Sequence, residues 1–530
     1  MSQTPANLKH LISPNWGKLT GKRAWRQNLG LAAISAGKVE SVLGPRGAYK
    51  MVTFNRGPER VIKVTKDAVE ILKELEVQYP AVKTLAEAAK IQREQAGDGV
   101  STMIVIISAI LRESEALMDK KVHPNVIVKG YRIAAKEALA TIEKSARVQG
   151  DSRKQILDIA DCGRGLLTPK LREAVMEACD RAAAQGGIDL RRIGILTRSG
   201  GAVSDSRLVR GVMVRKVKLN ASMPDELHDV KVAVVYKSMD NKPLELLKKG
   251  TGPFNIKLEI DEADKMKRFK AEERRMNDEL VDAVERAGAK VVLCRAKIIQ
   301  QVGDEMARRG ILAFEILDQP AIDAVAEAIG ATAVGDVKNL SERDLGFART
   351  VRVEKIDTID YFAVEADRGS TILLRGSSLE DVKETERVVK NVIRLMRNAS
   401  KDPRTVTGGA ALYMQIATRL RSYAPEFEGK EQVAIESFAN ALEQVAISLI
   451  RNYGLRWSVV LPLLRSYHAK GMHGMGVAEG GCKDMDEADV RELVYTAKTV
   501  VARAFEVASL LLRIDEYFYV KELAMVHKQE

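Results

Sequence analysis

The chain has 530 residues, of which 46% are hydrophobic and 29% are charged. This composition is typical of a globular protein and argues against intrinsic disorder, collagen-like fibres and a disulfide scaffold. The net charge of +12 is small beside 84 basic and 72 acidic residues, so it indicates a mixed-charge surface more than a nucleic-acid partner. At roughly 100–200 residues per domain, this length predicts about three or four domains.

The first 147 residues are predicted to be mostly helical. Two strand-like runs, residues 50–54 and 60–64, flank Asn55-Arg56-Gly57-Pro58, which favours a hairpin turn. Thr65 is predicted to cap the helix that follows the hairpin. Helical spacing of apolar residues predicts helices over 25–42, 68–77, 81–94, 101–117 and 125–145.

The middle of the chain alternates β-branched runs with helical stretches, and residues 215–371 resemble a separate α/β unit. A long charged helix is expected over 261–286, and another helix over 379–398. Helices dominate again over 410–514, before a strand-like tail at 517–520. This order predicts a nested architecture in which both chain ends form one base domain. The predicted strands of the middle lie at 186–190, 193–197, 209–218, 230–236, 291–294, 311–316 and 331–334.

The cysteines and the apolar stretches indicate in which cell compartment the protein is expected. The four cysteines stand far apart without a CxxC pair, which indicates a reducing compartment and no structural zinc site. Residues 1–14 contain no apolar signal-peptide core, and the longest apolar stretch, residues 100–111, is too short to cross a bilayer. We therefore expect a soluble, cytoplasmic protein without a membrane partner.

Three glycine-rich loops could bind phosphate. Gly97-Asp98-Gly99-Val100-Ser101-Thr102 stands at a loop-to-helix junction, where glycines and free N–H groups suit a phosphate. Asp98 could hold Mg²⁺ that bridges to the phosphates. Residues 43–47 and 407–410 are further candidates, although each run taken alone is also ordinary turn chemistry. His468 and His473 form no metal pattern and are expected to be exposed.

Taken together, the order and spacing of these loops resemble those of a group II chaperonin subunit, the archaeal thermosome and its eukaryotic cytosolic relatives. The resemblance covers essentially the whole chain. The segments that carry it are LGPRGAYKM at 43–51, TKDAVEIL at 65–72, GDGVST at 97–102, HPNVIVKGYR at 123–132, GGAVSDSRLVRGV at 200–212, ILLRG at 372–376 and LRID at 512–515.

The resemblance implies an α/β multidomain chaperonin fold. A mostly helical equatorial ATP-binding domain would comprise residues 1–147 and 405–530. A small intermediate hinge domain would comprise 148–214 and 372–404, and an inserted α/β apical substrate-binding domain would comprise 215–371. A helical protrusion at about 246–280 would act as a lid, with apolar tip candidates Phe254, Ile256 and Leu258.

The resemblance also implies a site for ATP and Mg²⁺, with the metal on Asp98. It assigns catalysis to Asp67, to the position of Asn391 and, in a shifted register, to Lys170. The residues it assigns to the nucleotide are Leu43, Gly44, Pro45, Gly47, Gly97, Asp98, Gly99, Val100, Ser101, Thr102, Gly408, Gly409 and Glu492.

Asn391 is the main departure from the family pattern, because it replaces the aspartate that the pattern places over the attacking water. An amide is a far poorer base than a carboxylate, and loss of a positioned base typically costs about 10²–10⁴ in rate. Smaller departures point the same way: family glycines have become Ala68 and Thr407, a threonine has become Val100, and the proline after the family glutamate has become Leu493.

We therefore predict a divergent subunit that binds ATP but hydrolyses it weakly or not at all. It would work beside paralogous subunits in a mixed double ring that encloses and folds non-native proteins. Two alternatives remain at this point. One is a structural ring or filament component that has the fold without folding activity. The other is a basic nucleic-acid binder, although the sequence offers no motif for a specific nucleic-acid partner.

Overall fold

The computed structural model describes residues 16–514 and 516–520, except 21, 57–58, 75–79, 149–156, 158–166, 185 and 241–262. The chain divides into two compact units. The first unit combines the chain ends, Met1–Arg164 with Asn398–Glu530, and the second is the inserted middle, Gly165–Arg397. The ends therefore fold together, as the nested pattern predicts, while the finer division into equatorial, intermediate and apical domains stays a prediction.

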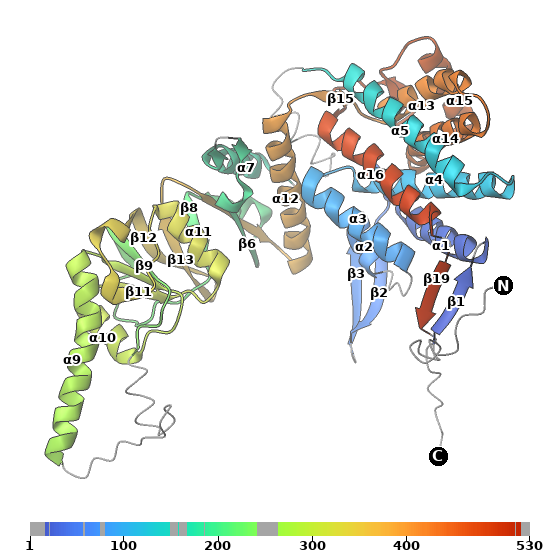
Figure 1. Cartoon of the computed structure of the whole chain (residues 1–530). Helices are drawn as coiled ribbons and strands as arrows, with labels where there is room; N and C mark the ends of the chain where they lie inside the picture. Colours follow the sequence, from blue (N-terminus) through green and yellow to red (C-terminus); the bar gives the residue numbers. More distant parts are fainter. Residues whose placement is uncertain are drawn as a thin grey trace, which may run out of the picture. The chain divides into compact units, whose positions relative to one another are not determined.

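The first unit is built mainly of helices around one apolar core (Figure 1). Helix α4 carries the apolar run 103–107 through this core, and Ile104, Ile106 and Ile107 have no exposed surface. Tyr131 and Phe438 meet in this core with ring centroids 5.5 Å apart. The principal helices are α1 (Lys22–Glu40), α3 (Pro80–Ala96), α4 (Val100–Asp119), α5 (Pro124–Ser145), α13 (Ala411–Tyr423), α14 (Lys430–Asn452), α15 (Trp457–Ala469) and α16 (Val494–Leu512).

Helix α14 is the only helix, among the described residues, with the length and apolar composition that could span a membrane. The share of its apolar window buried inside the protein is 72%. Its partners in the first unit are α4, α5 and α13. The apolar character of α14 is therefore explained by its place in the core.

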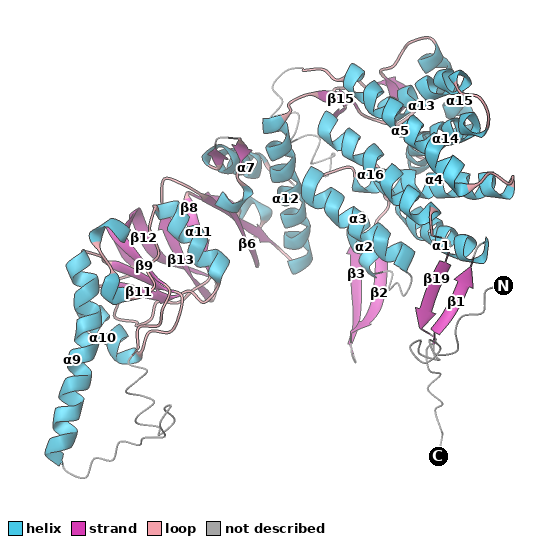
Figure 2. Cartoon of the chain, viewed as in Figure 1, coloured by secondary structure: helices cyan, strands magenta, loops and turns pink. Residues whose placement is uncertain are grey.

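The first unit also contains short pairs of antiparallel strands (Figure 2). Strands β2 (Lys50–Arg56) and β3 (Glu59–Thr65) form the predicted antiparallel hairpin. Strand β1 (Trp16–Thr20) pairs with β19 (Glu516–Val520), which brings the two ends of the chain side by side. Two further antiparallel pairs lie near the chain's C-terminal third: β15 (Thr405–Thr407) with β18 (Arg491–Leu493), and β16 (Met475–Ala478) with β17 (Gly481–Asp484).

The second unit contains a six-stranded mixed sheet with the order β11-β10-β9-β12-β13-β8. Its parallel strands β11, β10 and β9 form one side of the sheet, and the apolar runs 232–235 and 291–294 are fully buried, as such runs predict. Helices α9 (Ala263–Ala287), α10 (Gln300–Arg308) and α11 (Gln319–Ile329) belong to this unit. The strands are β8 (Gly211–Val214), β9 (Glu226–Val235), β10 (Val291–Cys294), β11 (Leu312–Glu315), β12 (Gly346–Ile356) and β13 (Ile359–Glu365).

A smaller sheet of the second unit has the order β6-β14-β7. Strand β14 (Ser370–Gly376) runs parallel to β6 (Ile193–Ser199) and antiparallel to β7 (Arg207–Val209). Helix α7 (Pro169–Arg181) packs on β14 and β7. The long helix α12 (Leu379–Lys401) follows and carries the chain back to the first unit.

Four local predictions need correction. Residues 331–334 form no strand but a single bridge from Val334 to Val235. The run 209–218 is two short strands, because Gly211 (φ 135°) breaks it where a Cβ would lie 2.0 Å from a backbone oxygen of β13. Asp67 caps the helix after the hairpin instead of Thr65, whose hydroxyl accepts a bond from the Asp67 N–H at 3.0 Å. His468 is buried, not exposed.

The predicted lid is described only in part. Helix α9 covers its second half, whereas the tip candidates Phe254, Ile256 and Leu258 lie outside the described residues.

His468 is 1% exposed, and its Nε2 lies 2.8 Å from the carbonyl oxygen of Met475. Burial of the ring lowers the pKa of His468, whereas His473 is exposed as predicted.

Candidate nucleotide site

The loop before α4 has the backbone that a phosphate needs. Gly97 (φ 81°) and Gly99 (φ 78°) both adopt the left-handed conformation, and Gly99 stands at the N-cap of α4. A Cβ on Gly99 would lie 2.6 Å from Val500 Cγ2 and 2.9 Å from Thr496 Cγ2. The sequence therefore requires glycine here for both conformation and space. The first turn of α4, which offers its free N–H groups, consists of the partly exposed Val100, Ser101 and Thr102.

Neighbouring side chains hold this glycine loop from both flanks. The amide of Gln92 on α3 donates to the backbone oxygen of Asp98 and to Thr499 Oγ1, both at 3.0 Å. The amide of Asn398 donates to the backbone oxygens of Gln95 and Ala96, at 2.9 and 3.0 Å. These bonds satisfy the carbonyls at the end of α3 and fix where the loop begins.

The loop at 43–47 is a second tight turn. Gly44 has φ 81°, and a Cβ there would lie 2.5 Å from Leu449 Cδ2. The amide of Asn452 on α14 donates to the backbone oxygen of Leu43 at 2.8 Å. Gly47 is required by space as well, because its Cβ would lie 2.2 Å from the backbone oxygen of Val42. The loop is thus closely fitted to α14 and to the end of α1.

Asp67, which follows the β2–β3 hairpin, has both carboxylate oxygens engaged. Its Oδ1 accepts from the Val69 N–H at 2.7 Å and caps α2 (Ala68–Glu74). Its Oδ2 accepts from Arg93 on α3 at 3.0 Å, and the Asp67 side chain is only 5% exposed. The adjacent Lys66 donates to the backbone oxygen of Pro45 at 3.1 Å. Asp67 is therefore held as a helix cap and ion-pair partner.

The third glycine loop joins β15 to α13. Gly409 (φ 59°) and Ala410 (φ 66°) are both left-handed, and the N–H of Val477 on β16 donates to the Gly409 oxygen at 2.9 Å. Beside it, Gly408 packs closely on Val490. An ion pair between Arg46 and Glu479 ties the 43–47 loop to the turn after β16. Direct contacts thus connect the third loop to the β16–β17 pair and that pair to the 43–47 loop.

Glu492 stands on β18 opposite Val406 and completes this part of the unit. The buried Tyr413 donates to the Glu492 carboxylate at 3.3 Å. Burial, together with the negative charge of Asp98, raises the pKa of Glu492 from 4.5 to about 8. The same surroundings raise the pKa of Tyr413. The carboxyl groups of Asp98 and Glu492 therefore influence each other near the start of α4.

This donor set fits a magnesium ion that arrives with a nucleotide. No cluster of three His, Cys, Asp or Glu side chains suited to a metal occurs among the residues that the structure describes. Mg²⁺ needs only one or two protein carboxylates when phosphates and water supply its other ligands. Asp98 is partly exposed and affects Glu492 electrostatically, so a cation at Asp98 would relieve the like-charge repulsion.

The raised pKa of Glu492 leads to a prediction on stability. A carboxyl whose pKa is higher in the folded than in the unfolded chain contributes stability that is fully present below pH ~4.5 and lost as the pH rises through ~8. We expect Glu492→Gln to remove this loss, by about 1–2 kcal/mol at pH ~9, because the partial exposure of Glu492 reduces the cost of its charge. Denaturant unfolding at pH ~6 and ~9 measures it, with the exposed Glu487→Gln as the control. Equal pH slopes for both variants would contradict a raised pKa of Glu492.

Two predicted catalytic residues lie in the other unit. Asn391 on α12 is partly exposed, and its Oδ1 accepts from Arg394 Nη1 at 3.4 Å. Lys170 is exposed at the start of α7 and donates to the backbone oxygen of Ser204 at 3.2 Å. The structure therefore joins the predicted residues of the first unit through the contacts above, whereas the roles of Asn391 and Lys170 stay predictions.

Sequence reasoning missed several residues that support the site. Gln92 and Arg93 lie about one turn before Gly97. Their position on the helix that leads into a glycine loop could have predicted that they support the loop. Tyr413 and Asn398 gave no such signal, because their contacts depend on segments more than 75 residues away. Only the tertiary fold brings such pairs together.

The chain is similar to known proteins along nearly its whole length. Residues 36–521 match the TCP-1/cpn60 chaperonin family. The chain is 33% identical over 518 residues to the thermosome subunit beta of Thermoplasma acidophilum, covering 95% of this chain and 93% of the relative. It is 32% identical to the thermosome subunit of Methanopyrus kandleri (97% and 95% covered) and 32% identical to the thermosome subunit alpha of Archaeoglobus fulgidus (96% and 94% covered).

The chain belongs to the TCP-1/cpn60 chaperonin family, whose members are protein-folding chaperones. The nested α/β multidomain architecture predicted from the sequence is thereby confirmed as a chaperonin fold. Its similarity to thermosome subunits along almost its entire length makes it a group II chaperonin subunit.

Proposed function

We propose that this chain is an ATP-binding subunit of a double-ring chaperonin that encloses and folds non-native proteins in the cytoplasm. Its own hydrolysis would be weak or absent, and it would work in mixed rings with paralogous subunits. The observation that carries the proposal is the left-handed glycine loop at the N-terminus of α4, with Asp98 beside Glu492.

The binding chemistry follows from the loops. Phosphate groups would accept hydrogen bonds from the free N–H groups of Val100, Ser101 and Thr102 and from their hydroxyls where present. Mg²⁺, when bound with the nucleotide, would neutralise phosphate charge and be held through Asp98. The loops at 43–47 and 408–409 would enclose the remainder of the ligand, since glycine lets a backbone approach closely.

Weak hydrolysis is supported by two features. Asn391 offers an amide where the family pattern has an aspartate, and an amide cannot take a proton from water at neutral pH. Asp67 keeps its carboxylate, but both oxygens already accept hydrogen bonds from Val69 and Arg93. A base engaged in this way orients water less readily than a free one.

Ring assembly is supported by the exposed surface of the β2–β3 hairpin. Met51 and Val64 stand opposite each other across the two strands, with 69% and 54% of their surfaces exposed. Tyr49, just before the hairpin, is 58% exposed. Large apolar side chains grouped in this way favour a protein partner over water, and the resemblance implies that this partner is a neighbouring subunit.

The assembly is tested by purifying the tagged chain from its source and weighing the intact complex by native mass spectrometry. We expect a double ring that also contains paralogous subunits, and loss of ring assembly in Met51→Lys. The matched control is Leu317→Lys, because Leu317 is similarly exposed (65%) in the second unit. A chain that stays monomeric, or a ring that Met51→Lys leaves intact, would count against the proposal.

Folding activity needs its own assay. We expect the purified ring to bind a chemically unfolded client protein and to suppress its aggregation. Ring assembly without any capture of unfolded clients would favour the alternative of a structural ring or filament component. Retention on RNA or DNA at moderate salt would instead support a nucleic-acid role.

A further inference from the structure

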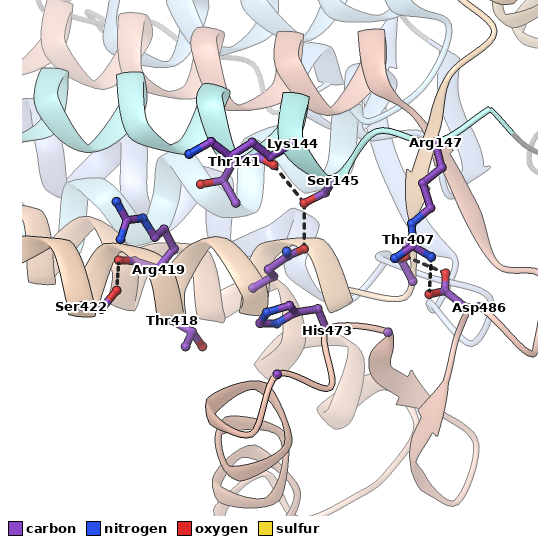
Figure 3. A pocket seen from close by; sticks show the side chains of 13 residues that line it. Thr141, Lys144, Ser145, Arg147, Thr407, Thr418, Arg419, Ser422, His473 and Asp486 are labelled. Atoms are coloured by element: carbon purple, nitrogen blue, oxygen red, sulfur yellow. Dashed lines mark hydrogen bonds and ion pairs between the residues drawn. The ribbon is translucent and has the colours of Figure 1, made fainter.

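The first unit contains a second pocket, of about 610 Å³, outside the proposed nucleotide site. Its walls come from the last turns of α5 and from α13, and the chain at 471–474 closes it from below (Figure 3). The pocket touches the β15–β18 pair through Thr407, whose side chain bonds to Asp486. Successive side chains of a strand point to opposite faces, so Glu492 and Tyr413 lie on the other face of that pair from Thr407 and Arg491.

Two polar helix faces line this pocket. The face on α13 consists of residues 415, 418, 419 and 422, and this spacing places all four on one side of the helix. On α5 residues 141, 144 and 145 follow the same rule. Helices that lie beside one another normally turn apolar stripes inward, whereas these faces offer hydroxyl, amide and cationic groups. The volume is within the range of small-molecule sites, roughly 300–1,000 Å³.

The charges of the pocket leave a positive surplus. The carboxylate of Asp486 accepts from Thr407 Oγ1 at 2.8 Å and from Arg491 Nη1 at 2.6 Å. The Arg491 side chain is 4% exposed, so its buried charge already balances Asp486. Arg147, 60% exposed, reaches Asp486 only at 3.5 Å and keeps most of its donors for another partner.

The opposite end of the pocket adds further cations. Arg419 is balanced by Glu137, 2.7 Å away. Lys144 is exposed and has no ion pair with any residue that the structure describes. The hydroxyls of Thr141, Ser145, Thr418 and Ser422 lie around these charges and already donate within the protein. Ser145 donates to the Gln415 Oε1 at 3.1 Å, and the other three donate to carbonyl oxygens of their own helices. Lys144 and Arg147 are thus the charges that a ligand can neutralise.

We propose that this pocket binds a small organic polyanion, with Lys144 and Arg147 as the main charge partners. The ligand would carry phosphate or carboxylate oxygens, which accept from lysine and arginine alike. This second site would be independent of the loop at 97–102, because it shares none of that loop's residues.

Calorimetric titration of the assembled protein with pyrophosphate and, separately, with citrate tests the proposal. We expect saturable binding of at least one probe, weakened about tenfold by Lys144→Gln and by Arg147→Gln, as loss of a charge-assisted bond predicts. Lys136→Gln on the exposed face of α5 is the matched control and should bind as the wild type does. Preference for pyrophosphate would identify a phosphate ligand, and preference for citrate a carboxylate ligand.

A further variant guards against an indirect effect of removing a lysine or an arginine. Gln415→Glu keeps the acceptor for Ser145 but adds a negative charge to the pocket wall, so it should also weaken binding about tenfold. Thermal midpoints of all variants should match the wild type, which separates loss of binding from loss of fold. Unchanged affinity in Lys144→Gln, Arg147→Gln and Gln415→Glu, or no binding of either probe, would overturn the proposal. If the protein fails to bind nucleotide but binds one of these probes as described, the proposed function is wrong and the polyanion site still stands.

Discussion

Replacing Asn391 with aspartate is expected to raise the rate of ATP hydrolysis by about 10²-fold. The substitution restores a carboxylate at the position where the family pattern has one, and a positioned base contributes about 10²–10⁴ in rate. We expect the lower end of this range because Arg394 Nη1 lies 3.4 Å from the Asn391 oxygen, and a cation so close would make the new carboxylate a weaker base. Steady-state phosphate release measures the gain.

Arg93→Gln should add to this gain by freeing Asp67, whose Oδ2 now accepts from Arg93 at 3.0 Å. The double variant Asn391→Asp with Arg93→Gln should then exceed either single variant. Asn339→Asp introduces the same charge at an exposed site elsewhere in the second unit and serves as the control. If Asn391→Asp hydrolyses ATP no faster than Asn339→Asp while still binding it, the assignment of Asn391 to catalysis is wrong.

Gly99→Ala is expected to lower the free energy of unfolding by roughly 2–4 kcal/mol and to abolish nucleotide binding. An alanine in the left-handed conformation costs about 1–2 kcal/mol, and Gly99 has φ 78°. Its Cβ would also lie 2.6 Å from Val500 Cγ2, and overpacking of this kind costs about 1–3 kcal/mol. Relief of either strain would move the N–H groups that open α4. Denaturant unfolding and a fluorescent-nucleotide titration measure the two effects.

The matched control for this substitution is Gly37→Ala on α1. Gly37 has nothing within 4 Å of the position of a Cβ and has no positive φ, so alanine there should stabilise the helix by about 0.5–1 kcal/mol. Asp98→Asn separates binding from folding, because it should keep the fold and lose the Mg²⁺ dependence of nucleotide binding. Gly99→Ala with wild-type stability and affinity would show that the loop is not closely packed against α16.

The sequence predicts the helices of the first unit well, because their apolar faces recur at helical spacing and glycines mark their ends. It fails where tertiary contacts override local signals. The sequence pattern of residues 331–334 predicts a strand, yet only Val334 forms a bridge to β9. His468 stands next to a glycine-rich stretch but lies inside the core, where its ring contacts the Met475 carbonyl oxygen.

The candidate site shows the same division. Motif order was enough to predict Gly97, Asp98 and Gly99, because the backbone conformation of the loop depends on its own residues. The state of Asp67 could not be predicted, since it depends on Arg93, which lies 26 residues further along the chain. The raised pKa of Glu492 likewise depends on Asp98, which only the fold brings near.

We propose that this subunit retains ATP without consuming it. The most direct measurement is to incubate the purified protein with Mg²⁺ and radiolabelled ATP, remove free nucleotide and identify what stays bound over time. We predict that bound nucleotide stays ATP, and that Asn391→Asp converts it to ADP under the same conditions. Rapid conversion to ADP by the wild-type protein, or no retained nucleotide at all, would contradict the account.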